Sequence, residues 1–269
     1  MPVAVAVATA ALATAAFAHG FVRLRRRGRA DLAGWDRAAL FASAVVLWLV
    51  ALSPRVDELA HQLLAAHMLQ HMLIADTVPA LLLVAVRGPL LFFLLPALLT
   101  RWLARRSWLR AVAAQLLRPS VAFVVWGASI AVWHVPALYD RALGDPRLHA
   151  LEHATFVLGG VLVWMQLIDP AGRYALSPWQ RLGYALGLLV GGMALANTLI
   201  LAYRPIYSAY AGLADRPLGL TALGDQNLAG LVMLAEQVAA LGTFAAILLR
   251  RWLRAPVAGE SAERHPFAV

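Results

Sequence analysis

Two pairs of histidines have a spacing that suits metal binding. His67 and His71 lie in the stretch HMLQHM, and His149 and His153 lie in HALEH. Residues four apart on a helix lie on one face, about 40° apart around the axis, so both imidazoles of a pair can reach one point beside it. Ionisable side chains in an apolar helix usually face a site or a partner. The spacing therefore predicts two pairs of imidazoles directed at a metal ion or a haem iron.

The elements that must position these histidines are membrane-spanning helices. The chain has 269 residues, of which 62% are hydrophobic and 14% charged, and its mean hydropathy is +0.71. Water-soluble domains of this length do not have such a composition. The sequence contains no cysteine, which excludes disulfides and thiolate sites, so a soft metal would have to be bound by His and Met.

Apolar runs long enough to cross a bilayer predict an all-α polytopic membrane protein, a bundle of seven transmembrane helices. We expect a seven-span domain over residues 1–254 and a polar C-terminal tail over 255–269. The segment 88–99 would make only about 18 Å of helix, too short to cross, and is expected to be re-entrant or interfacial. The predicted spans are 2–19, 35–52, 61–86, 119–136, 147–168, 180–203 and 225–249.

The distribution of arginine predicts how the bundle is oriented. All 23 basic Lys or Arg residues are arginines, and they lie between the apolar runs rather than together on one soluble surface. We therefore expect a lipid bilayer as partner and no nucleic acid. Arginine is enriched on the cytoplasmic side, which predicts an outer N-terminus and a cytoplasmic C-terminus. The arginine-rich segments are 20–37, 87–118, 169–181 and 250–269.

The first apolar run has an alternative interpretation as a cleaved signal peptide. Ala16, Phe17 and Ala18 resemble a cleavage site. The run lacks the positive charge that precedes the apolar part of a signal peptide, and cleavage would export the arginines that follow it. We therefore interpret this run as the first span.

With this orientation, further candidate ligands fall in the outer leaflet beside the two histidine pairs. His134 ends the fourth span and Asp225 opens the seventh, where Gln226, Met233 and Gln237 share one helical stripe. Gln70, Glu152 and Gln226 are expected to orient ring nitrogens or to balance charge. The predicted metal ligands are His67, His71, His134, His149, His153, Met233 and Asp225.

Two carboxylates lie deep in the predicted spans. Asp76 is in the third span and Glu236 in the seventh. A charged carboxylate is costly at this depth unless it is paired, neutralised or hydrated. The sequence allows a path for protons or cations, and it equally allows neutral carboxyl groups bonded to a neighbouring helix.

Four motifs occur in order, and together they resemble the CtaG-type cytochrome c oxidase assembly factor family. They are HMLQHM, WHVPALYD, HALEH and DQNLAGLVM, within roughly residues 55–250. The resemblance implies a non-enzymatic protein of the bacterial plasma membrane that helps copper to reach the catalytic subunit of a haem–copper oxidase. We expect an extracytoplasmic copper donor as a second partner. The residues that stand in the motifs are His67, His71, His134, His149, His153 and Asp225.

Two other functions are compatible with the same histidines. A haem-binding transmembrane electron-transfer protein would use them as axial ligands. An intramembrane zinc hydrolase would use three of them as ligands and an acid such as Glu152 or Asp225 to activate water. The metal content and a visible spectrum would distinguish these functions from copper binding.

Overall fold

The computed structural model describes residues 3–173, 175–213 and 215–254, and within these ranges all regular secondary structure is helical. The predicted tail, 255–269, lies outside the described residues, as does His265. Six segments of the described chain are long and apolar enough to cross a membrane, which confirms the all-α polytopic class. They are Val3–Arg26, Ala30–Ala51, Leu64–Val86, Pro146–Ile168, Pro178–Leu201 and Ala222–Leu253.

A seventh crossing depends on a bent pair of helices. Helix α8 (Ser107–Leu116) and helix α9 (Pro119–Trp133) pass the same test only together, and they meet at an angle of 73°. Helix α9 alone has 15 residues, or about 22 Å of helix. The predicted fourth span therefore corresponds to a short helix that packs along α11 (Pro146–Ile168).

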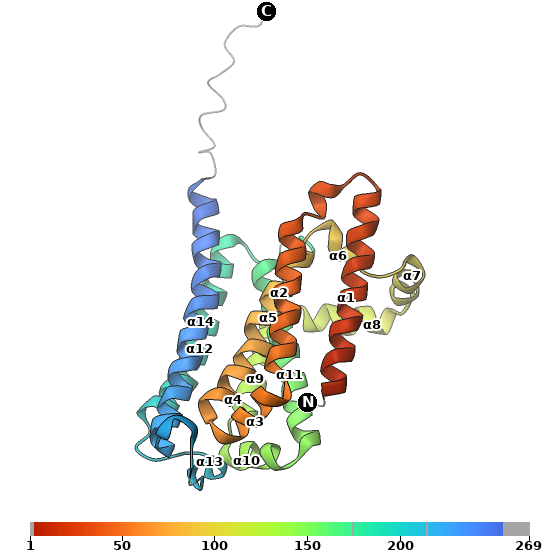
Figure 1. The fold of residues 1–269 in the computed structure, drawn as a ribbon. Coiled ribbons are helices and arrows are strands. Elements are labelled where there is room, and N and C mark those ends of the chain that lie inside the picture. The colour runs from red at the N-terminus through yellow and green to blue at the C-terminus, as the bar shows by residue number, and fades with distance from the viewer. Residues whose placement is uncertain (1–2, 174, 214, 255–269) are drawn as a thin grey trace, which may run out of the picture.

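The bundle has two ends of different composition (Figure 1). At one end lie the start of α1 (Val3–Arg26), helix α10 (Pro136–Gly144) and helix α13 (Ser208–Ala211). We call it the histidine end, because His67 and His149 lie there. At the arginine-rich end, α1 finishes with three arginines in its last turn and α14 (Ala222–Leu253) with two. The remaining long helices are α2 (Trp35–Ala51) and α12 (Pro178–Leu201), and two short 3-10 turns are Ala30–Leu32 and Pro217–Gly219.

The predicted third span, 61–86, is divided where the sequence gives no obvious sign. Ser53 caps helix α3 (Pro54–Gln62), and Pro54 occupies its first turn. Leu63 is extended, with φ −132° and ψ 124°, and helix α4 (Leu64–Met72) begins after it. The span therefore starts at Leu64, and His61 belongs to the separate helix α3.

The middle of the third span contains a π-helical turn at Leu73–Thr77, before α5 (Val78–Val86). A π turn changes the hydrogen-bonding of the helix locally and is often found at functional sites. Helix α11 packs against this turn. It comes so close at Gly160 that a Cβ atom there would collide with the carbonyl oxygen of Ala75. Only glycine fits at position 160 without a shift of one of the two helices.

The segment 88–99 forms no long helix. Helix α6 (Pro89–Phe93) ends before a break, and helix α7 (Ala97–Arg105) follows Pro96. Helix α6 packs against α1 near the arginine-rich end, where Leu90 joins the buried cluster of Phe17 and Phe21. Both helices are too short to cross a membrane, as predicted for this segment.

Candidate metal centre

The two histidine pairs predicted from spacing meet in the structure. All four rings are buried, and each offers a ring nitrogen such that the four atoms lie within 4.8 Å of one another. Two of the histidines come from α4 and two from α11, and both pairs occupy the fourth and eighth positions of their helices. We call this group the histidine cluster: His67, His71, His149 and His153.

The pairs face each other in register. Within each helix the two ring centroids are 4.3 Å apart, whereas His67 lies 5.2 Å from His149 and His71 lies 5.1 Å from His153. The Nε2 atoms of His67 and His149 are separated by 3.3 Å. A tetrahedral ion with metal–nitrogen bonds of about 2.0–2.1 Å places its ligand nitrogens about 3.3 Å apart. This separation therefore fits two ligands of one ion.

Several ring nitrogens in the cluster have no hydrogen-bond partner among the described residues. On His71 and on His153, both Nδ1 and Nε2 are buried and unpartnered. Buried polar atoms are nearly always hydrogen-bonded, and an exception calls for an explanation such as a bound ion or water. Imidazole is a common ligand for copper and zinc. The donor set therefore fits a metal ion.

Two tyrosines hold the ring of His67. Its Nδ1 atom lies 2.8 Å from the hydroxyl oxygen of Tyr210 and 2.9 Å from that of Tyr139. The Tyr210 hydroxyl donates to the backbone carbonyl of Ala60, so its oxygen is available to accept from Nδ1–H. In that tautomer Nε2 of His67 has a free lone pair, as a metal ligand requires. Burial raises the pKa of both tyrosine hydroxyls well above the usual value, which keeps them neutral.

Asp225 lies at the start of α4 rather than among the four histidines. Its two carboxylate oxygens accept hydrogen bonds from the backbone N–H groups of Leu64 and Ala65, at 2.8 and 3.0 Å. The residue is fully buried. Its charge offsets the positive end of the α4 dipole, one turn from the place where a cation would bind. Asp225 thus positions the helix that presents His67 and His71.

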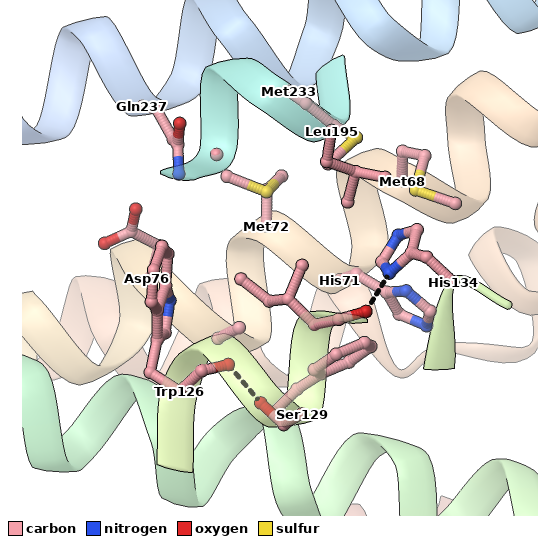
Figure 2. A pocket seen from close by; sticks show the side chains of 14 residues that line it. Met68, His71, Met72, Asp76, Trp126, Ser129, His134, Leu195, Met233 and Gln237 are labelled. Carbon is pink, nitrogen blue, oxygen red and sulfur yellow. Dashed lines mark hydrogen bonds between the residues drawn. The ribbon is translucent and has the colours of Figure 1, made fainter. Parts of the chain in front are cut away.

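His134 and Met233 line a cavity next to the histidine cluster (Figure 2). His71 forms part of the same wall, and the sulfur-bearing side chains of Met68 and Met72 lie close by. The cavity volume is about 50 Å³, enough for a few water molecules. Nδ1 of His134 is 2.9 Å from the carbonyl oxygen of Ile130, and its Nε2 atom is buried without a partner among the described residues. These residues flank the cluster and are not members of the group of four.

The three residues predicted to support the ligands have different environments. Gln70 donates to the carbonyl of Ala51 at 2.7 Å. Gln226 accepts from the N–H of Ile206 and donates to the carbonyl of Leu199, so it ties the α12–α14 connection to α14. Glu152 is buried on α11 between the two cluster histidines, and its Oε1 atom has no partner among the described residues. Gln70 and Glu152 each directly precede a cluster histidine in the sequence, His71 and His153.

The tyrosines that hold His67 were not predicted. Tyr139 stands in the motif WHVPALYD, in which the sequence predicts only His134 as a ligand. Tyr210 follows in the connection after α12, and Tyr207 stacks on Tyr139 with ring centroids 4.0 Å apart. The sequence feature that could have indicated these tyrosines is the stretch YSAY, in a connection expected on the same side of the membrane as the histidines.

A family model described as cytochrome c oxidase caa3 assembly factor matches residues 15–255. The chain belongs to this family. The match includes α4, α9, α11, α12 and α14, the helices that contribute to the cluster and the adjacent cavity. Searches of curated proteins and of solved structures gave no match. The resemblance inferred from the four motifs is confirmed. This chain contains a buried group of four histidines that could hold a metal ion.

Proposed function

We propose that the histidine cluster binds a copper ion as cargo and that the protein helps to deliver it to the catalytic subunit of a haem–copper oxidase during assembly. The observation that carries the proposal is the group of four buried imidazoles, two of which have both ring nitrogens unpartnered. Membership of the cytochrome c oxidase caa3 assembly factor family supports the oxidase as the recipient of the copper ion. No bond in a substrate has to be made or broken, so the proposed role is not enzymatic.

The surroundings of the cluster support copper as the ion. The sequence contains no cysteine. The site therefore binds copper without thiolate ligands, which makes it easier to transfer the ion to another protein. Met68, Met72 and Met233 line the cavity beside His71. Thioether sulfur is a soft ligand that suits Cu(I). We infer that an ion leaves the cluster past His71 and is held briefly by these sulfurs and by His134.

The positions of the arginines support an orientation for delivery. Arg23, Arg25 and Arg26 end α1 and Arg250 and Arg251 end α14, all at one end of the bundle. We propose that this end faces the cytoplasm of a bacterial cell and that the histidine end faces outward. The N-terminus would then be outside and the C-terminus inside. An extracytoplasmic copper donor would reach the cluster from the outer side.

The two alternative functions fit the geometry less well. A haem needs a pocket of several hundred Å³, whereas the cavity beside the histidine cluster has about 50 Å³. A catalytic zinc site keeps a coordination position open for water, and four histidines within 4.8 Å of one another would fill a tetrahedral ion. Glu152 remains the candidate base that such a hydrolase would need.

The proposal is tested on the purified full-length protein. We expect elemental analysis after copper loading to give one copper per chain, with no Soret band in the visible spectrum. The double variant His67→Ala, His71→Ala should lose the copper and reduce oxidase activity in the host. His61→Ala is the matched control, because His61 lies in α3 with an exposed side chain and outside the cluster. Unchanged copper in the double variant would refute the ligand assignment, and zinc without copper would favour the hydrolase.

A further inference from the structure

Two carboxyl groups stand between two cavities in the middle of the bundle. Asp76 lines the cavity that begins at His71 and extends to Gln237 (Figure 2). Glu236 lines a second cavity of about 510 Å³, between α5, α11 and α14, which extends to Arg87, Arg181 and Arg251. Asp76 thus belongs to the side of the histidine cluster and Glu236 to the side of the arginine-rich end.

The hydrogen bonds around the pair leave room for a shared proton. The carboxyl groups of Asp76 and Glu236 are neighbours, because Thr77 follows Asp76 directly in the chain and Trp164 lines the cavity of Glu236. The indole N–H of Trp164 donates to Asp76, and the hydroxyl of Thr77 donates to Oε1 of Glu236. The Oε2 atom of Glu236 is buried and has no hydrogen-bond partner among the described residues.

Two buried carboxyl groups that are neighbours are expected to hold one proton between them. Two neighbouring carboxylates in a poorly solvated site do not both ionise, since their repulsion and desolvation raise the energy of the doubly charged form. His71 and His134 line the cavity of Asp76 and the three arginines line that of Glu236, but among the described residues none of them is ion-paired with either carboxyl group. The other polar neighbours, Trp126, Trp164, Thr77 and Gln237, are uncharged.

The distance to the histidine cluster is short enough for electrostatic coupling. Asp76 follows His71 by five residues in the same span, which is about 7 Å along the axis. In an interior of low dielectric constant, a cation at this distance strongly favours a negative charge on the pair. A cation bound by neutral imidazoles is a buried charge, and a negative charge on the pair would add to the compensation by Asp225 at the start of α4.

We propose that Asp76 and Glu236 form a proton-binding site that releases its proton when a copper ion enters the histidine cluster and regains it when the ion leaves. This inference rests on the proposed function. The O–H bond of the shared carboxyl group breaks, the proton passes to water in the larger cavity, and the copper ion keeps its oxidation state. One positive charge enters the interior of the bundle as another departs.

The experiment measures the proton directly on the full-length protein in detergent. Infrared difference spectra on addition of Cu(I) report the C=O stretching band of a protonated carboxyl group. A pH indicator in weakly buffered solution counts the protons released per bound ion. The variants are Asp76→Asn, Glu236→Gln and the double variant. Glu58→Gln is the matched control, because Glu58 is an exposed carboxylate of α3 at the histidine end.

We expect the wild-type band to disappear on copper binding, with release of one proton per ion, and the Glu58→Gln control to behave identically. The double variant should lack the band and release none. If it does not fold, the single variants serve, because each should shift the wild-type band and lower the proton count. Copper binding that leaves the wild-type band unchanged would overturn the coupling and leave the copper proposal intact. A wild-type protein that binds no copper would overturn the copper proposal and the coupling with it, and the band in the metal-free protein would still report the shared proton.

Discussion

The Nδ1 atom of His67 lies 2.8 Å from the hydroxyl oxygen of Tyr210, so a residue of the α12–α14 connection fixes the orientation of a ring on α4. Tyr210 itself is anchored on the carbonyl of Ala60. This contact links the end of the bundle to the histidine cluster and makes the ring of His67 the most constrained of the four.

Replacing Tyr210 by Phe should weaken copper binding without abolishing it. The ring of His67 would lose a partner that holds its tautomer, and such a loss typically lowers metal affinity by about 10-fold to 100-fold. Competition titration with a Cu(I) chelator measures the change. Tyr203→Phe is the control, because Tyr203 is 98% exposed. An affinity equal to that of Tyr203→Phe would show that the hydroxyl does not support the ligand.

Replacing Asp225 by Ala should destabilise the protein and leave the copper stoichiometry unchanged. The variant leaves two buried backbone N–H groups of α4 without their acceptor, which costs about 1–3 kcal/mol. Thermal unfolding in detergent measures the stability, and Asp215→Asn at an exposed position is the control. Loss of copper from folded Asp225→Ala protein would instead support the ligand role predicted from the sequence.

Replacing Gly160 by Ala should destabilise the packing of α11 against the π-helical turn. The new Cβ atom would collide with the carbonyl of Ala75, and forced overpacking costs about 1–3 kcal/mol. Gly127→Ala on α9 is the matched control, since a Cβ atom there meets nothing within 4 Å. The two unfolding midpoints should differ clearly, and equal midpoints would show that the helices separate at little cost.

The buried tyrosines at the histidine end should make the protein sensitive to alkaline pH. Burial raises the pKa of Tyr139, Tyr207 and Tyr210 above the usual 10.0. The unfolded chain therefore loses these protons first, so the stability is fully present below about pH 10 and declines as the pH rises above it. Tyrosinate absorbance and the unfolding midpoint should change together. Complete ionisation of all tyrosines near pH 10 in the folded protein would contradict this.

The histidine cluster was predictable because its signal is local. Four-residue spacing places His67 with His71 and His149 with His153 on any regular helix. The common depth followed from counting spans, and the structure brings the two pairs together. Sequence alone could not show that the pairs come into register, which depends on how α4 and α11 pack.

The features that were not predicted depend on contacts between distant parts of the chain. The break at Leu63 has no Pro or Gly at that position, and the N–H groups that it frees are accepted by Asp225. The π-helical turn packs closely against Gly160 of another span. Tyr210 reaches His67 across 143 positions of the sequence. None of these follows from periodicity or local propensity.

The π-helical turn at Leu73–Thr77 has a geometric consequence for the whole span. Each residue of a regular helix advances about 100° around the axis. A turn with one extra residue therefore rotates the side chains of α4 around the helix axis relative to those of α5. Deletion of a single residue from this turn would leave α5 facing α2 as before and would swing the imidazoles of α4 about a quarter of a revolution away from α11. The extra residue therefore determines the direction in which His67 and His71 point, while α5 keeps its own packing.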